Sequence, residues 1–159
     1  MKKLERLWTP WRMQYIKNAV KTKACIFCKK LKEKDSVAYV VKKTKYSFSM
    51  LNIYPYNNGH VMVAPKRHIA RLNLLSAEER TDLIELVSET QSLLEKKCKP
   101  HGFNIGINSG RVAGAGVVGH LHFHIVPRWD GDTNFMPIIG ETKVIAQLLE
   151  ETYRELIGK

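Results

Sequence analysis

Residues 119–127 read Gly119-His120-Leu121-His122-Phe123-His124-Ile125-Val126-Pro127, so three histidines occupy alternate positions among apolar residues. Alternation with a period of two predicts a β-strand that carries the three imidazoles on one face and points Leu121, Phe123 and Ile125 into the core. Each imidazole has two ring nitrogens that need partners when they are buried. An ordinary half-exposed strand that happens to be rich in histidine is therefore the weaker interpretation, and a functional site is the stronger one.

The residues just upstream favour phosphate chemistry. A row of histidines suits either a metal site or a site in which a histidine attacks phosphorus. The preceding stretch, Asn108-Ser109-Gly110-Arg111-Val112-Ala113-Gly114-Ala115-Gly116, is a loop of small residues. Main-chain N–H groups in such loops can approach an anion closely. We therefore interpret Asn108, Ser109 and the amides around Gly114 to Gly116 as groups that hold phosphate oxygens.

Composition narrows the class of protein. A length of 159 residues suits one domain. The sequence has no apolar run long enough to span a bilayer and no signal-peptide core, so we expect a cytoplasmic protein without membrane contact. The formal net charge of +11 would attract phosphate-bearing ligands. We expect no specific nucleic-acid partner, because the lysines lack the regularly spaced aromatic residues of a base-stacking surface.

Periodicity and capping signals predict the secondary structure. Thr9-Pro10 starts a short helix, and Ser76 with Glu79 forms a capping box for a long helix that ends before Pro100. The core-facing stripe of that long helix consists of Leu83, Leu86, Val87, Thr90, Leu93 and Leu94. The remaining elements are strands over Val37–Val41, Tyr46–Leu51, His60–Ala64 and Gly102–Asn108, the last paired with the histidine strand, and a final helix over about Lys143–Leu156.

The row of histidines resembles the signature of the histidine-triad (HIT) superfamily. His120-Leu121-His122-Phe123-His124-Ile125-Val126 follows the pattern His, apolar, His, apolar, His, apolar, apolar. Three flanking segments resemble the bacterial dinucleoside-polyphosphate branch of that superfamily, in particular its diadenosine tetraphosphate phosphorylases. These segments are Leu7-Trp8-Thr9-Pro10-Trp11-Arg12-Met13, the pair in Cys25-Ile26-Phe27-Cys28, and Gly131-Asp132-Thr133-Asn134-Phe135-Met136-Pro137.

The resemblance implies an α+β fold with a twisted antiparallel sheet of about five strands, one long helix, one C-terminal helix and a short N-terminal helix. It divides the chain into an N-terminal extension over residues 1–24, a HIT core over 25–130 and a C-terminal segment over 131–159. It also implies a homodimer in which the sheets or the helices of two chains are joined.

The cysteine pair predicts a metal site. Two residues between two thiolates let both sulfurs reach one metal ion, and a redox role is disfavoured because the pair precedes the first strand. Spacing alone leaves His60, His68, His101 and one triad histidine as candidates for the other ligands. The resemblance implies that His68 and His120 complete the set, so that Cys25, Cys28, His68 and His120 hold a structural zinc ion. A reduced pair without metal is the alternative.

The central histidine is the expected nucleophile. A neutral imidazole nitrogen can attack phosphorus near neutral pH, which assigns nucleotidyl transfer to His122. His124 would stabilise charge or donate a proton to the leaving group. The resemblance implies that Asn52 contacts the ribose of the nucleotide, with a turn-forming asparagine as the alternative. It also implies that His60 supports the triad from the substrate-binding side.

The acceptor of the nucleotidyl group decides the reaction, because water gives a hydrolase and inorganic phosphate gives a phosphorylase. Hydrolases of the superfamily often carry Gln four residues before the first triad histidine, and here that position is Gly116. The resemblance therefore favours phosphorolysis of diadenosine tetraphosphate to ATP and ADP. The alternatives are a dinucleoside-polyphosphate hydrolase, a nucleoside phosphoramidase, a nucleotide-binding regulatory module without turnover, and a metalloenzyme that uses all three histidines as ligands.

Overall fold

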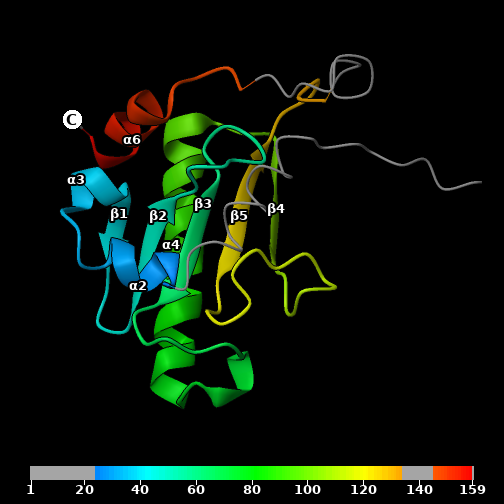
Figure 1. Ribbon diagram of the computed structural model, residues 1–159. Helices are drawn as coiled ribbons and strands as arrows, with labels where there is room; N and C mark the ends of the chain where they lie inside the picture. Colours follow the sequence, from blue (N-terminus) through cyan, green and yellow to red (C-terminus); the bar gives the residue numbers. More distant parts are fainter. Residues whose placement is uncertain (1–23, 134–144, 159) are drawn as a thin grey trace, which may run out of the picture.

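Five antiparallel strands form one sheet in the order β1-β2-β3-β5-β4. The structure is a computed structural model that describes residues 24–133 and 145–158. Together with the helices, this sheet confirms the predicted α+β fold (Figure 1). The strands are β1 (Val40–Lys43), β2 (Ser47–Leu51), β3 (Val61–Pro65), β4 (Gly102–Ile107) and β5 (Phe123–Arg128).

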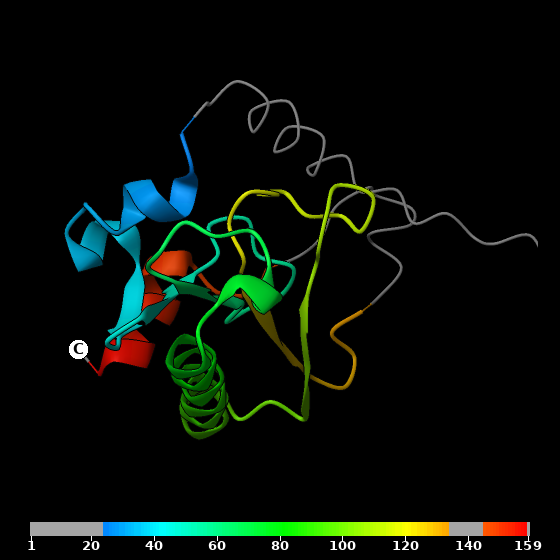
Figure 2. The same cartoon turned by 90° about the horizontal axis from the view of Figure 1, so that it is seen from below.

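Helices cover both faces of the sheet. The long α4 (Ala77–Cys98) packs on β2, β3 and β5, and α6 (Leu149–Ile157) contacts both α4 and β1. The opposite face carries α2 (Ile26–Lys30) and α3 (Asp35–Ala38), and Figure 2 shows α4 and α2 on opposite sides of the strands. A short 3-10 helix, η1 (Leu72–Leu74), precedes α4. Within the described residues, no helix has the length and apolar character needed to cross a membrane.

The two layers explain why β2 and β3 are buried along their whole length. Side chains of a strand alternate between its faces. Leu51 packs with the core under α4, whereas Phe48 and Met50 pack with the core under α2, which includes Phe27. A sheet covered on both faces leaves no solvent-exposed side for these central strands, so their sequences are apolar or small at every position.

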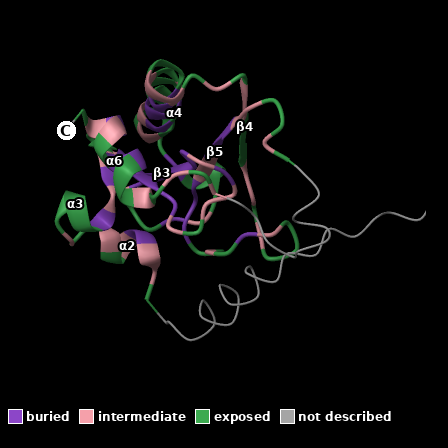
Figure 3. Ribbon diagram, turned by 90° about the horizontal axis from the view of Figure 1, so that it is seen from above, coloured by how far each residue is buried: buried purple, intermediate pink, exposed green. Residues whose placement is uncertain are grey.

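The helix α4 has the predicted start, end and buried face. The Glu79 N–H donates to Ser76 Oγ over 3.2 Å, and the Ser76 N–H donates to Glu79 Oε2 over 2.9 Å, which closes the capping box. Lys99 in a left-handed conformation (φ 47°) ends the helix before Pro100. Figure 3 shows the buried stripe of α4 turned toward the sheet and its exposed side turned outward. The buried residues of the helix are Leu83, Leu86, Val87, Thr90 and Leu94.

The structure corrects three predicted boundaries. Asp35–Ala38 forms one helical turn that ends at Tyr39 (φ 55°), so the strand predicted from Val37 begins only at Val40. Residues 145–148 are not helical, and α6 begins at Leu149 rather than at Lys143. The predicted N-terminal helix and residues 134–137 lie outside the described residues.

The third correction concerns the histidine strand, which begins at Phe123 and not before His120. Phe123 still pairs with Val63 on one side and with Ile107 on the other. Two residues earlier, the Leu121 N–H donates to the carbonyl of Ile69 over 2.6 Å, which is outside the sheet. His120 and His122 therefore lie in an irregular stretch that leads into β5. Leu121 and Ile125 are buried in the core and Phe123 packs partly buried against it, as predicted.

Candidate active site and metal cluster

Four predicted metal ligands converge at the start of α2. Cys25 precedes this helix and Cys28 lies within its first turn. The Sγ of Cys25 lies 3.3 Å from Nδ1 of His120, and the Sγ of Cys28 lies 3.3 Å from Nδ1 of His68 and 3.7 Å from Nδ1 of His120. Atoms of all four residues lie within 4.8 Å of one another. Tetrahedral zinc–ligand bonds place neighbouring ligand atoms roughly 3.3–3.8 Å apart, so the set fits a four-coordinate metal ion.

A main-chain hydrogen bond orients the ring of His120 toward the cysteines. Its Nε2–H donates to the carbonyl of Pro65 over 2.8 Å, which leaves the Nδ1 lone pair facing the cysteine sulfurs. Burial, with smaller contributions from the neighbouring His68 and His122, lowers the pKa of His120 to about 4, although the hydrogen bond to the Pro65 carbonyl raises it. A neutral imidazole is the form that binds metal.

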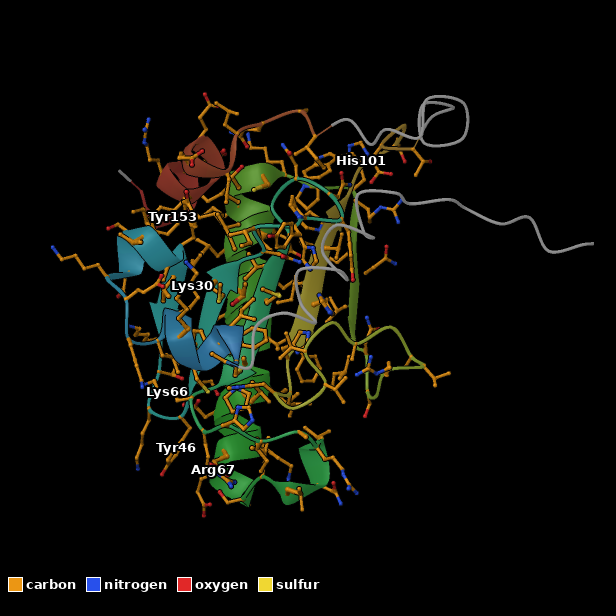
Figure 4. The ribbon with its side chains drawn as sticks, in the orientation of Figure 1. Lys30, Tyr46, Lys66, Arg67, His101 and Tyr153 are labelled. Carbon is orange, nitrogen blue, oxygen red and sulfur yellow. The ribbon has the colours of Figure 1, made fainter. Side chains whose placement is uncertain are left out.

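The other two candidate ligands lie elsewhere. His60 contacts His124 instead of the cysteines. The half-exposed ring of His101 lies 3.1 Å from the carboxylate of Asp130, and Figure 4 shows His101 at the far end of β4 and β5 from α2. Within residues 24–133 and 145–158, the cluster that could hold a metal ion thus includes one triad histidine and not three.

His122 is buried and held in one tautomer. Its Nδ1–H donates to the carbonyl of His120 over 2.7 Å, so its Nε2 keeps a lone pair. Burial lowers the pKa of His122, and the contact with the His120 carbonyl only partly opposes this, so the ring is neutral near pH 7. The ring of Phe27 lies against it at 4.8 Å between centroids, and the ring of His124 lies at 4.9 Å.

A second chain of contacts sets the tautomer of His124. The Tyr56 N–H donates to Nδ1 of His60 over 3.0 Å, so His60 carries its proton on Nε2. This Nε2–H lies 2.9 Å from Nδ1 of His124 and donates to it. Neutral His124 therefore carries its own proton on Nε2, where a proton donor to a leaving group would need it.

Asn52 supports the same loop. Its Oδ1 accepts the Tyr54 N–H over 2.9 Å, and its Nδ2 lies 3.3 Å from Nδ1 of His60. The side chain is buried, with 8% of its surface exposed. The turn-forming role weighed for Asn52 is thus seen directly, and its contact with the ribose stays a prediction.

One hollow adjoins His124, and a second lies between η1, the start of α4 and the loop after β4. The first has a volume of about 410 Å³, with Tyr56, Asn108 and the residues of β4 along its walls. The other has a volume of about 550 Å³ and is lined by Arg71, Leu72, Asn73, Arg80 and Ser109. Asn108 and Ser109, adjacent in the chain, thus face different hollows.

The loop amides have partners inside the loop. The Gly114 N–H donates to the carbonyl of Arg111 over 3.0 Å, and the Ala115 N–H donates to that of Gly110 over 3.2 Å. Gly110 and Gly114 adopt φ values of 90° and 88°, which favour glycine. Gly116 is exposed. In this conformation two of the amides expected to hold phosphate oxygens hold the loop itself together.

Three further residues shape the site and are not among its predicted residues. Phe27 lies between the two cysteines and packs on His120 and His122 at 5.0 and 4.8 Å, so an aromatic residue inside the cysteine pair was the available signal. The Tyr56 ring lies 4.7 Å from that of His60. Asp132 joins the loop before β3 to the end of β5, and no local pattern in the sequence marks it.

Comparison with known proteins identifies the family. Residues 33–131 match the family model of the HIT domain, and the chain belongs to the HIT family. It is 41% identical to a Mycobacterium tuberculosis protein named AP-4-A phosphorylase. The two sequences align over 161 residues, which is 96% of this chain and 83% of that protein.

Two further relatives extend the comparison. An adenosine 5'-monophosphoramidase of Schizosaccharomyces pombe is 37% identical over 105 residues, which is 66% of this chain and 74% of that protein. The crystal structure of a zinc-bound histidine triad family protein from Mycobacterium smegmatis has the same fold, with a TM-score of 0.66 and 24% identity over 85% of this chain and 91% of that one.

Proposed function

We propose that this chain is a nucleotidyl-transfer enzyme whose reaction is the phosphorolysis of diadenosine tetraphosphate to ATP and ADP. The observation that carries the proposal is the tautomer of His122, because its Nδ1–H is bound by the His120 carbonyl and its Nε2 keeps the lone pair of a nucleophile. The similarity over 96% of the chain to a protein named AP-4-A phosphorylase supports the choice of substrate.

The proposed reaction has two steps. Nε2 of His122 attacks the α-phosphorus, a nitrogen–phosphorus bond forms, and the bond to the β-phosphate oxygen breaks so that ATP leaves. His124 donates its Nε2 proton to the leaving phosphate oxygen or binds it as that charge develops. Inorganic phosphate then attacks the adenylyl-His122 intermediate, which gives ADP and restores the free imidazole. We assign the hollow beside His124, with Asn108 on its wall, to the nucleotide.

We also propose that the cluster of Cys25, Cys28, His68 and His120 holds zinc as a structural ion. Two thiolates and two imidazoles are the donor set that zinc prefers in closed sites. Such an ion supplies stability and fixed geometry rather than chemistry on the substrate. His120 would transmit that fixed geometry, because its side chain belongs to the cluster and its carbonyl holds His122.

We further propose a homodimer in which the β4 strands of two chains pair. Because β4 is an edge of the sheet, its outer main-chain groups are available to a second copy. Ile105 in the middle of this strand is 40% exposed, so the pairing of a second copy along β4 would cover it.

The experiment that tests the reaction measures turnover of diadenosine tetraphosphate with and without inorganic phosphate, with products separated by ion-exchange chromatography. We expect ATP and ADP only when phosphate is present. His122→Ala should lower turnover at least about a thousandfold, whereas His101→Ala, outside the site, should leave it unchanged. Turnover without phosphate would instead favour a hydrolase.

A second candidate is a nucleoside phosphoramidase, which the similarity to the Schizosaccharomyces pombe enzyme favours. In that reaction Nε2 of His122 would again attack the phosphorus, and an amine would leave instead of a phosphate. If diadenosine tetraphosphate is not turned over but adenosine phosphoramidate is cleaved, and His122→Ala abolishes the cleavage, this candidate replaces the first. If neither is turned over while nucleotide binds, the chain is a binding module.

A further inference from the structure

The hollow of about 550 Å³ is lined by positively charged side chains to which the proposed reaction assigns no role. Arg71 and Arg80 are the charged residues on its wall, and Asn73 and Ser109 add neutral hydrogen-bond donors. No acidic residue lines it. A planar guanidinium donates two parallel hydrogen bonds to a phosphate group, so two arginines beside amide and hydroxyl donors form a surface suited to phosphate.

The position of this hollow follows from two contacts with the triad stretch. Arg71 lies two residues after Ile69, whose carbonyl accepts the Leu121 N–H between His120 and His122. Ser109 lies two residues after Ile107, which pairs with Phe123 at the start of β5. Two residues span at most ~7 Å, so Arg71 and Ser109 each lie within that distance of a residue that contacts the triad stretch. Figure 1 shows η1 and the loop after β4 at the same end of the molecule, below the start of β5.

Among the described residues, no carboxylate forms an ion pair with either arginine of the hollow. Glu79, next to Arg80 in the chain, accepts two hydrogen bonds from Arg67, at 2.8 and 2.7 Å. The charge of Glu78 interacts with Arg80, but the Glu78 carboxylate accepts its hydrogen bond from Ser76 Oγ. Arg80 donates from one Nη to the carbonyl of Leu75, which fixes the guanidinium without neutralising it. Among the described residues, the Arg71 guanidinium has no acidic or hydrogen-bonding partner. Both arginines thus keep their charge for a ligand.

The reaction needs a second place for phosphate. The polyphosphate carries several negative charges beyond the α-phosphate at His122, and the acceptor is itself an anion. The amides of Gly114 and Ala115 are engaged inside their loop, so they do not supply that place. The basic hollow lined by Arg71, Arg80 and Ser109 offers such a place.

We propose that Arg71, Arg80 and Ser109 form a second subsite that binds a phosphate group of the reaction. The group is either free inorganic phosphate, the acceptor, or the distal phosphoryl group of the dinucleotide. This inference rests on the proposed function for its role in the reaction, but the binding itself can be measured without turnover.

The kinetic test uses the double variant Arg71→Gln/Arg80→Gln. We expect its KM for one phosphate-bearing substrate to rise about tenfold or more, with kcat at saturation near that of the wild type. A rise for inorganic phosphate identifies the acceptor as the occupant, and a rise for diadenosine tetraphosphate identifies the distal phosphoryl group. Arg154→Gln on α6 removes an exposed arginine far from the hollow and should change neither KM. Unchanged KM values for both substrates in the double variant would overturn the proposal.

The binding test separates this inference from the proposed function. Calorimetric titration of the whole chain with inorganic phosphate, and separately with tripolyphosphate, should show affinity for at least one probe that falls about tenfold in the double variant and not in Arg154→Gln. Arg71→Lys should keep part of the affinity, because it keeps the charge and loses the paired donors. This result without any turnover would refute the phosphorylase and keep the subsite. Equal binding by the wild type and the double variant, or no binding by the wild type, would refute the subsite.

Discussion

Main-chain atoms determine which ring nitrogen of His120, His122 and His60 carries the proton. The Pro65 carbonyl holds Nε2 of His120, the His120 carbonyl holds Nδ1 of His122, and the Tyr56 N–H holds Nδ1 of His60. Main-chain groups remain when a side chain is replaced. A variant at Tyr56 would therefore lose an aromatic wall of the hollow without losing the hydrogen bond that orients His60.

Asp132 is the residue that ties the loop before β3 to the end of β5. Its carboxylate accepts two hydrogen bonds from Arg128, at 2.6 and 2.7 Å, and one from Nδ2 of Asn57 at 2.7 Å. Only 9% of its side chain is exposed. The Arg128 guanidinium, followed by the Trp129 N–H and Asn57, holds the pKa of Asp132 at about 2, against burial, which raises it.

This pKa predicts a stability that depends on pH. A carboxylate whose pKa falls from 3.8 to about 2 on folding contributes about 2 kcal/mol, which is fully present above pH 4 and is lost as the pH falls toward 2. We expect Asp132→Asn to lower the free energy of unfolding by about this amount at pH 7 and by about half as much at pH 3, as measured by urea unfolding.

The matched control for that prediction is Asp130→Asn, because the Asp130 side chain is 96% exposed. It should change the free energy of unfolding by less than about 0.5 kcal/mol. A loss in Asp132→Asn that is the same at pH 7 and pH 3 would show that the charge of this carboxylate is not what stabilises the fold.

At the level of elements, sequence patterns predicted most of the sheet and one helix accurately. The capping box at Ser76 is a local signal, and α4 begins where it predicts. The strands β2, β3 and β4 lie within one residue of their predicted bounds, because apolar residues and turn residues mark their ends.

The start of β5 could not be predicted in the same way. The alternating pattern continues through His120 and His122, but β5 begins at Phe123 because Leu121 bonds to Ile69 instead of to a strand. This contact joins residues 52 positions apart in the sequence, and periodicity carries no information about such distant partners. For the same reason, neither the contacts of Asp132 nor the tautomers of the histidines could be predicted from local sequence patterns. The clustering of His68 with the cysteines was available only through the family resemblance.

The cluster that joins α2 to the stretch before β5 yields a prediction for metal removal. Cys28→Ser should bind less metal than the wild type by elemental analysis, and it should unfold at a lower temperature. A ligand present at a thousand times its dissociation constant stabilises a fold by about 4 kcal/mol, and treatment with a chelator should remove a similar amount from the wild type.

Cys98 supplies the control for this prediction. It is half-buried near the end of α4, burial raises its pKa to about 11, and it lies outside the cluster. Cys98→Ser should therefore keep the metal content of the wild type. The metal assignment would be wrong if Cys28→Ser also kept it.

For the whole molecule, the prediction concerns assembly. Light scattering after size-exclusion chromatography should give twice the chain mass of 18.3 kDa. Ile105→Lys places a charge on the exposed edge strand and should shift the protein to monomers. The control is Ile84→Lys, which makes the same substitution on the exposed surface of α4, where Ile84 is 48% exposed. It should leave the dimer intact. Dissociation by Ile84→Lys instead would mean that helices, not sheets, join the two chains, and a monomeric wild type would exclude the dimer.

The strand order also determines when in folding the histidines meet. The pairs β1-β2 and β2-β3 join neighbours along the chain, and so does the pair β4-β5. The seam between β3 and β5 joins Val61 to Ile125, across the whole of α4 and β4. Contacts between distant residues cost more chain entropy to close and form later than local ones. His60 precedes β3 on one side of this seam, and His124 lies in β5 on the other. We therefore expect the contact between these two histidines to form only when the β1-β2-β3 segment packs against the β4-β5 segment.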